Sequence, residues 1–455
     1  MGCERRPGHG FGYNPINQGD GRETAMSFKK ILKGSIPFGK ASQEKTLIVD
    51  KTEYIARLED SGIKMALFLR PRRFGKSFFT RALYAYYDTA FKREFASSFK
   101  GTWIGSHPTP RASSYCCLMM DFSGLCSDPS RSRESLGFVL LRAMTEFSKY
   151  HPDKGMPLGK ILELPTGDPL AMMKAFVRYF TEHAGEDDLI YIIIDECDSL
   201  ADEILARSRK TVLDPEAIPP ADDGSLKDFF DLLKSCAGGS RGRPIDRVFM
   251  TGVVAGTIGK LGPGLGLCQD ISLMEWCNAM AGITLGELSL VIDETVDFAK
   301  IPGLSKGELL DIMRKGFDGY VFSPQCHEHV LNTSLCLTFL HDLIMQKGLP
   351  RQIDDGSIAD GEEKLRVVMA LADPRACDEV ASLALDQKPI IARPPQALDL
   401  KHAGQFDRDE LVLLLACLGY LTIVPGQDTK ADGAETCYMT PNEVFHSIFL
   451  EWAGC

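Results

Sequence analysis

The sequence lacks the cysteine spacings that mark disulfide-rich or zinc-binding proteins. Its 14 cysteines include no C-x-x-C pair, and no secretory signal is apparent, so they do not indicate a disulfide framework. The one cluster of metal-ligand residue types, at residues 326–329, matches no established zinc spacing. We therefore expect most cysteines to act as small buried hydrophobic residues, as Cys116 and Cys117 would within their strand-like run.

The sequence also lacks an excess of positive charge and any long apolar run. Its formal net charge is -11, which argues against broad electrostatic attraction to nucleic acid or to anionic membranes. The most apolar run, residues 411–424, contains Gly419 and is too short to span a bilayer. These absences predict a soluble, intracellular and cytoplasmic protein with no membrane partner, and they count against nucleic acid as a partner.

The length of the chain and its changes of pattern predict how it divides into domains. A chain of 455 residues is long enough for two or three domains. Residues 1–25 are rich in glycine and polar residues and show no periodicity, which predicts a disordered tail. Residues 26–289 alternate between apolar strands and helices, whereas residues 290–455 change to helices. We therefore expect an α/β domain followed by a helical or winged-helix-like domain.

Four apolar runs are strand candidates, at residues 65–69, 115–121, 189–194 and 247–252. The third is unbroken and β-branched, as expected for a strand of a parallel sheet with both faces covered. Because helical patterns separate these runs, we predict a mostly parallel sheet flanked by helices. In the C-terminal half, glycines, prolines and acidic residues at residues 354–361 and 387–399 predict linkers.

The turn after the first strand candidate carries the strongest functional signal. Residues 70–77 read Arg-Pro-Arg-Arg-Phe-Gly-Lys-Ser and run directly into an amphipathic helical pattern. A strand, a turn ending in Gly-Lys-Ser and a helix form the arrangement that binds nucleotide phosphates, because turn amides and the helix N-terminus point at the anion. Lys76 would reach the β- and γ-phosphates, and the hydroxyl of Ser77 would hold Mg²⁺.

Arginine stands at position 70, where the general pattern G-x-x-x-x-G-K-[ST] has its first glycine. The side chains of Arg70, Arg72 and Arg73 would either neutralise phosphate charge or pair with acids of the C-terminal domain, and the sequence leaves both roles open. The candidate nucleotide-binding residues of the turn are Arg70, Pro71, Arg72, Arg73, Phe74, Gly75, Lys76 and Ser77.

Two acidic residues follow the third strand candidate directly. Asp195 stands where a carboxylate completes the Mg²⁺ shell, and Glu196 is placed to act as general base on the attacking water. The alternative is that both residues merely cap an apolar strand at its solvent edge. Thr251 ends the next strand candidate, where a polar residue would contact the γ-phosphate or the water, or would simply be satisfied by the backbone.

With these residues in place, the chain resembles the AAA-ATPase-like family, a branch of the P-loop ATPases. The resemblance covers roughly residues 28–444, and its most specific motif is Arg-Pro-Arg-Arg-Phe-Gly-Lys at residues 70–76. In that family an arginine at position 70 is the rule. The other segments that carry the resemblance are residues 49–52, 121–123, 194–198, 250–253, 270–272, 316–320 and 418–422.

The resemblance implies a nucleotide site and identifies two departures from the family. It implies ATP binding through the turn at residues 75–77, Mg²⁺ binding at Asp195, and a position near the base or ribose for Asp50 and Lys51. Many members carry a C-terminal nuclease-like domain, which we do not carry over to this chain. Members often have serine and arginine soon after the threonine-glycine pair, where this chain has Val-Ala at residues 254–255. A sensor arginine is therefore expected to be missing.

Together these patterns predict a P-loop protein that binds ATP and, with Mg²⁺, hydrolyses it to ADP and phosphate while coupling nucleotide state to domain movement. The alternative is a nucleotide-gated interaction switch with little or no turnover, which the missing sensor arginine favours. A third reading, a protein that handles nucleic acid, rests on family analogy alone. The sequence identifies neither a protein partner nor an oligomeric state.

Overall fold

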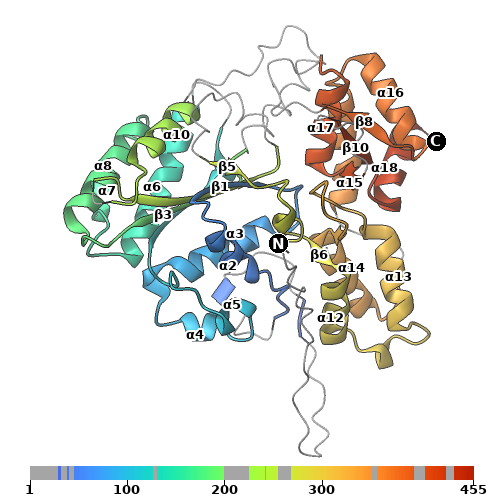
Figure 1. The fold of residues 1–455 in the computed structure, drawn as a ribbon, viewed down its shortest axis with the longest axis horizontal. Helices are drawn as coiled ribbons and strands as arrows, with labels where there is room; N and C mark the ends of the chain where they lie inside the picture. The colour runs from blue at the N-terminus through green and yellow to red at the C-terminus, as the bar shows by residue number, and fades with distance from the viewer. Residues whose placement is uncertain are drawn as a thin grey trace, which may run out of the picture.

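The computed structural model describes ten stretches of the chain. These stretches are residues 29–31, 38–39, 46–126, 131–198, 225–240, 242–254, 268–350, 356–393, 405–426 and 435–454. The predicted tail, residues 1–25, lies outside them. An α/β part and a mostly helical C-terminal part lie side by side (Figure 1).

A five-stranded, all-parallel sheet forms the centre of the α/β part, which confirms the predicted fold class. The strand order is β2-β3-β4-β1-β5. Consecutive strands of the chain are therefore not always neighbours, and β4 lies between β1 and β3. The strand bounds are β1 (Met65–Leu69), β2 (Cys116–Asp121), β3 (Ile190–Asp195), β4 (Ile245–Gly252) and β5 (Gln269–Asp270).

Helices cover both faces of the sheet because successive strand residues point to opposite sides. Ile192 and Met250 belong to the core on one face, whereas Ile193 and Phe249 belong to the core on the other. This two-sided burial explains the unbroken apolar run of β3, all of whose residues are buried. The first face packs against α6 (Ser132–Tyr150), α8 (Pro169–His183) and α10 (Ser225–Cys236), and the second against α2 (Glu53–Asp60), α3 (Lys76–Tyr87) and α5 (Trp103–Ser106).

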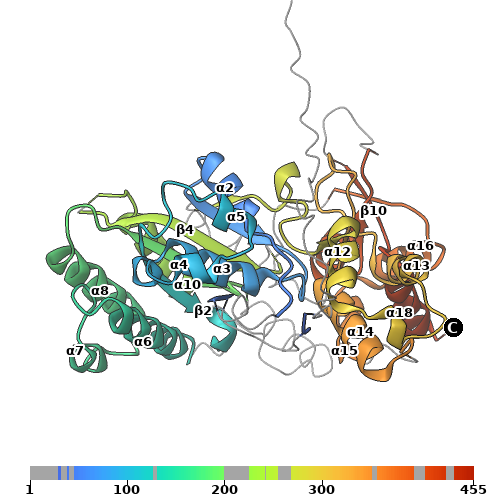
Figure 2. The same cartoon turned by 90° about the horizontal axis from the view of Figure 1, so that it is seen from below.

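The helical part occupies one end of the molecule (Figure 2). Its first helices surround a core of their own and include α12 (Leu285–Thr295), α13 (Lys306–Phe317) and α14 (Thr333–Gln346). A three-stranded antiparallel sheet of order β8-β10-β9 follows. Its strands and the surrounding helices are α15 (Gly356–Met369), α16 (Pro374–Leu385), β8 (Ile390–Ala392), α17 (Arg408–Leu418), β9 (Thr422–Ile423), β10 (Thr436–Met439) and α18 (Glu443–Ala453).

The two segments predicted as linkers, residues 354–361 and 387–399, contain secondary structure, so both predictions were wrong in part. Helix α15 begins at Gly356 inside the first predicted linker, and β8 lies inside the second. Tertiary contacts explain the difference, because α15 packs against α18 and β8 pairs with β10. These partners are distant in sequence, so local glycine and proline content does not reveal them.

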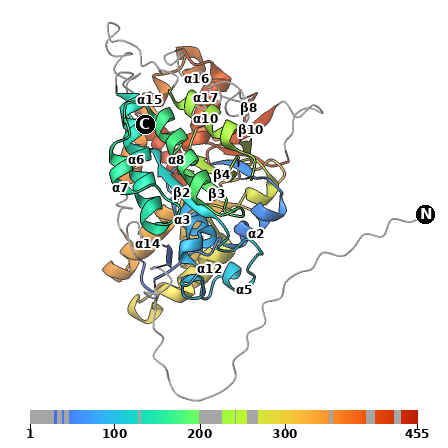
Figure 3. The same ribbon diagram turned by 90° about the vertical axis from the view of Figure 1, so that its left-hand side faces the viewer.

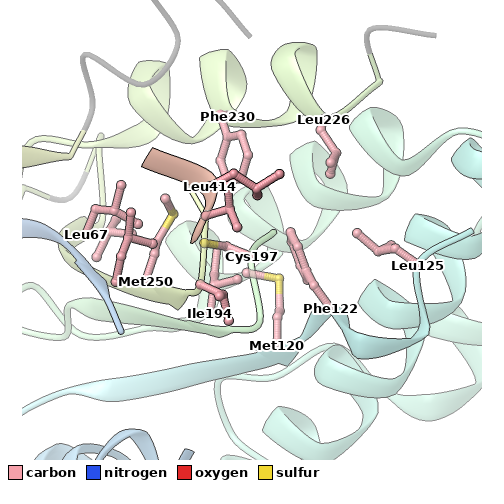
Figure 4. Close-up of a cluster of buried hydrophobic side chains, with 14 of the residues drawn as sticks. Leu67, Met120, Phe122, Leu125, Ile194, Cys197, Leu226, Phe230, Met250 and Leu414 are labelled. Carbon is pink, nitrogen blue, oxygen red and sulfur yellow. The ribbon is translucent and has the colours of Figure 1, made fainter. Parts of the chain in front are cut away.

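The C-terminal part shares a hydrophobic core with the central sheet. Leu414 of α17 lies in one buried cluster with Leu67, Cys197, Phe230 and Met250 (Figure 4). Helix α17 belongs to the most apolar run of the sequence, and its Leu411, Leu414 and Leu415 are buried in the protein. Of the helices in the described stretches, none combines the length and the apolar character needed to cross a membrane.

Candidate functional site

The turn after β1 has a backbone that depends on one glycine. Gly75 has a φ of 100°, in the left-handed region that favours glycine. Helix α3 begins at the next residue, and the first amides of an α-helix have no acceptor within the regular helix. A helix N-terminus preceded by such a turn is a binding site for anions.

Lys76 points its amine into this turn. The Nζ atom donates hydrogen bonds to the carbonyl oxygens of Arg70, at 2.8 Å, and Pro71, at 3.0 Å. Burial lowers the pKa of Lys76 to about 8, although the negative charges of Asp198, Asp195 and Glu196 oppose this decrease. The structure therefore brings the lysine into electrostatic reach of the acidic residues that follow β3.

Asp195 and Thr251 meet at the carboxyl ends of two neighbouring strands. The hydroxyl of Thr251 donates a hydrogen bond of 2.6 Å to Oδ1 of Asp195. Both side chains are buried. The sequence left open a hydrogen bond from Thr251 to the backbone. In the structure the hydroxyl of Thr251 donates to the carboxylate of Asp195 instead.

Glu196 is exposed, and its backbone is in the left-handed region with a φ of 53°. Partial desolvation raises the pKa of Glu196, and the charges of Asp195 and Asp121 raise it further. Asp121 ends β2 and is the register partner of Asp195. Sequence reasoning did not select Asp121 as a site residue, although an acid directly after an apolar strand was the available signal.

A further acid, Asp198, braces the two segments that carry these groups. Its Oδ2 atom accepts hydrogen bonds of 2.7 Å from the backbone amides of Val253 and Val254. The segment after β3 is thereby tied to the segment after β4.

The sequence predicted that a sensor arginine is missing at residues 254–255. Val254 lies within the described residues, and Ala255 lies outside them.

The three arginines of the turn have different surroundings. The guanidinium of Arg70 is buried and donates to the carbonyl oxygens of Leu69, Ser272 and Cys277. It also lies between two aromatic rings, 4.5 Å from the centroid of Phe68 and 4.2 Å from that of Phe322. Burial lowers the pKa of Arg70 to about 9. The side chain thus holds the turn to a distant segment, which is neither of the two roles considered from the sequence.

Arg72 and Arg73 are exposed at the surface of the turn. The charge of Arg72 lowers the pKa of both Lys76 and Glu196, so it lies within electrostatic reach of both. Arg73 has a φ of 69°, and its carbonyl accepts a hydrogen bond from the amide of Ser334. The charge of Arg72 therefore acts on the candidate site.

A cavity of about 210 Å³ adjoins the turn and is lined in part by Phe74 and Gly75. Its walls are mostly apolar and come from the segment before α2, the first turns of α3, residues 280–282 and the start of α14. Lys51 lines it, and the Nζ atom of Lys51 forms an ion pair of 2.6 Å with Glu287. Burial lowers the pKa of Lys51, an effect that Glu287 opposes.

Asp50, expected beside Lys51 at the nucleotide, does not line the cavity. Its carboxylate accepts hydrogen bonds from the amide and hydroxyl of Thr52 and from the amide of Trp103. The structure therefore places Asp50 in the turn that positions α2 and α5. Thr52 itself is buried and lines the cavity.

The chain matches a protein-family model. The model described as "Predicted AAA-ATPase" (AAA-ATPase_like) matches residues 34–261, about half of the chain. The matched segment contains the turn after β1 and the carboxyl ends of β2, β3 and β4. A search of curated proteins finds no match.

Proposed function

The chain belongs to the AAA-ATPase-like family of predicted AAA-ATPases, and we propose that it binds ATP with Mg²⁺ and hydrolyses it to ADP and phosphate. The observation that carries this proposal is the position of Lys76, whose amine lies in an anion-binding turn within electrostatic reach of Asp195 and Glu196. A cation for phosphate oxygens and carboxylates for metal and water are the parts that phosphoryl transfer requires.

Binding of the triphosphate changes the hydrogen-bond acceptors of the Lys76 amine. The amine of Lys76 now donates to two carbonyl oxygens of its own turn. Phosphate oxygens are stronger acceptors because they are charged, so they replace these carbonyls as partners of the amine. Amides of the turn and of the first turn of α3 donate to the same anion. Arg72 adds positive charge at the open side of the turn.

The oxygen donors at the site suit Mg²⁺, which prefers carboxylates, hydroxyls and phosphate oxygens. The buried carboxylate of Asp195 and the hydroxyl of Ser77 would hold the ion, and Thr251 fixes the orientation of Asp195. When bound, Mg²⁺ neutralises the charge of the phosphates. Glu196, exposed and with its pKa raised, accepts the proton of the attacking water.

The cavity beside Gly75 is our proposed site for the adenine base. Its apolar walls suit the faces of a flat ring, and it adjoins the turn that takes the phosphates. Lys51 and Thr52 border it, so they are the groups nearest to the base or ribose. Asp50 supports this wall through Thr52 and is not proposed as a ligand.

Contacts between the turn and the helical part support coupling of nucleotide state to domain movement. The hydroxyl of Thr333 donates to the carbonyl oxygen of Phe74 at 2.9 Å, and the amide of Ser334 donates to that of Arg73 at 3.1 Å. Gly419, with a φ of 86°, lies so close to Pro71 that a Cβ there would meet the proline ring at 3.1 Å. A rearrangement of the turn on ATP binding therefore acts directly on α14 and on the end of α17.

Equilibrium ATP binding by the Lys76→Ala variant tests the proposal. Loss of a charged hydrogen bond to phosphate costs about 1.5–3 kcal/mol, so we expect affinity to fall by at least about tenfold. The matched control is Lys227→Ala, an exposed lysine on α10. Equal ATP affinity of the two variants would contradict the site. Another outcome is that the wild type binds ATP and the Lys76→Ala variant loses that binding while neither releases phosphate. In that case the nucleotide-gated switch describes the protein better than an ATPase.

A further inference from the structure

Helix α6 carries an ordered stripe of side chains on its outer face. Glu134, Phe138 and Arg142 follow one another at four-residue spacing, which places them on one side of the helix. Phe138 is 54% exposed, whereas Leu136 and Leu140 on the inner side are fully buried. The stripe therefore consists of an exposed aromatic ring between an acid and a base.

This stripe is complementary to itself. In two α6 helices that run antiparallel with Phe138 at the centre, Glu134 of each copy lies opposite Arg142 of the other. Each charge stands four residues from the centre, which is about 6 Å along a helix axis. The two rings meet at the centre, with an ion pair on either side. A contact of this kind, in which one surface binds its own copy, is the isologous contact of a two-fold dimer.

The charges of the stripe have no partner within the described residues. Neither Glu134 nor Arg142 forms an ion pair or a side-chain hydrogen bond there, whereas Glu146, one turn further on, pairs with Lys149 at 3.6 Å. A second copy supplies both missing partners at once. Charge complementarity thus points to a copy of the same chain as the occupant of this surface.

The surroundings of Phe138 leave room for a second aromatic ring. The residue borders a groove of about 700 Å³ between α6 and α3 along the open edge of β2, with Tyr84 and Met119 also in its walls. The short helix α7 (Leu158–Leu162) packs against α6 and exposes two further leucines, Leu158 at 53% and Leu162 at 62%. Helices α6 and α7 lie on the side of the molecule that is turned away from the helical part (Figure 3).

We propose that the Glu134–Phe138–Arg142 stripe of α6 is the contact surface of a homodimer whose two-fold axis passes near Phe138. The surface is one helix with apolar neighbours, at the small end of specific interfaces and below about 1,200 Å² in total. The dimer is therefore concentration-dependent, with a dissociation constant in the micromolar range. The groove beside the stripe is also lined by Asp121 at the end of β2, so the association is measured without nucleotide to test it apart from the proposed ATP chemistry.

Sedimentation equilibrium of the full chain tests this surface. We expect the mass of the wild type to rise from one chain toward two as the protein concentration approaches about 100 µM, where a micromolar dimer is populated. Higher salt weakens the association because screening acts on exposed ion pairs. A wild type that keeps the mass of one chain at the highest concentration overturns the proposal.

Charge reversal separates this contact from any other dimer. Glu134→Arg and Arg142→Glu each place like charges opposite one another at two symmetric positions, and we expect each to weaken association by at least about tenfold. The double variant Glu134→Arg/Arg142→Glu restores opposite charges, so its dissociation constant returns to within about threefold of the wild-type value. The control is Glu182→Arg, at an exposed position of α8.

Circular dichroism and thermal unfolding verify that each variant is folded. Residues 134, 142 and 182 are exposed, so we expect these substitutions to leave the fold intact. Single variants that associate as well as the wild type overturn the proposal. A double variant that associates as weakly as the single variants also overturns the proposal, because antiparallel pairing about Phe138 predicts that the double variant regains association.

Discussion

Thr251 and Asp195 are joined by a hydrogen bond of 2.6 Å between a hydroxyl and a carboxylate on neighbouring strands. Both groups are buried, so the bond holds Asp195 in one orientation at the end of β3. The threonine at the end of β4 therefore acts on the site through the acid that we propose as the Mg²⁺ ligand.

The first prediction concerns this bond. Thr251→Val keeps the shape of the side chain and removes the 2.6 Å donor to the buried Oδ1 atom of Asp195, which keeps the longer 3.2 Å hydrogen bond from the amide of Glu196. We expect the rate of ATP turnover to fall by about tenfold to a hundredfold because the metal ligand is misplaced. Steady-state phosphate release provides the measurement, and Thr251→Ser is the control that keeps the hydroxyl. Equal rates for the valine and serine variants would show that the bond is dispensable.

The second prediction separates the roles of two arginines. Arg70→Ala removes three hydrogen bonds to buried carbonyl oxygens, so we expect the free energy of unfolding to fall by about 3 kcal/mol or more. Arg72→Ala changes an exposed residue, and we expect a change in stability within about 0.5 kcal/mol but weaker ATP binding. Urea unfolding and equilibrium binding measure the two effects. A stable Arg70→Ala protein would contradict the bracing role.

The third prediction follows from the pKa of Lys76, which is about 8 in the absence of nucleotide. Only the protonated amine binds phosphate oxygens well, so the bound state keeps the proton to higher pH. ATP affinity should therefore be constant below about pH 8 and fall as the pH rises through that value. Isothermal titration across this range, with Lys76→Arg as a variant that stays charged, provides the test. A pH-independent affinity for the wild type would argue against contact between the amine and phosphate.

The fourth prediction concerns Asp121, whose negative charge contributes to the raised pKa of Glu196. A general base must be deprotonated, so turnover rises with pH through the pKa of Glu196. Asp121→Asn removes one like charge and lowers that pKa, so we expect the rise in turnover to move to lower pH. Asp153→Asn, at an exposed position just after α6, is the control. Unchanged profiles in both variants would exclude this influence.

Local sequence patterns predict much of the fold because the patterns themselves are local. The β-branched run at residues 189–194 identifies β3, since a strand buried on both faces needs apolar residues throughout. The Gly75-Lys76 pair between a strand and a helix predicts the turn, because its backbone depends on the glycine. The parallel sheet follows from the alternation of such strands with helices.

Features that depend on partners far along the chain were not predictable. Arg70 is separated by some two hundred residues from Ser272 and Cys277, the carbonyl groups that hold it. The influence of Asp121 on Glu196 requires β2 to lie beside β3, and no local pattern reveals that strand order. The cavity likewise forms only when segments near residues 50, 80, 280 and 333 meet.

ATP hydrolysis at this site is tested most directly by steady-state phosphate release from the wild type and from Glu196→Gln, with ATP binding measured on the same samples. We predict that the variant binds ATP as the wild type does, and that its turnover is lower by about 10² or more because the general base is lost. The exposed Glu182→Gln variant should match the wild type in both measurements. Equal turnover by wild type and Glu196→Gln would contradict the assignment of the base, and wild-type turnover no higher than that of Lys76→Ala would contradict hydrolysis.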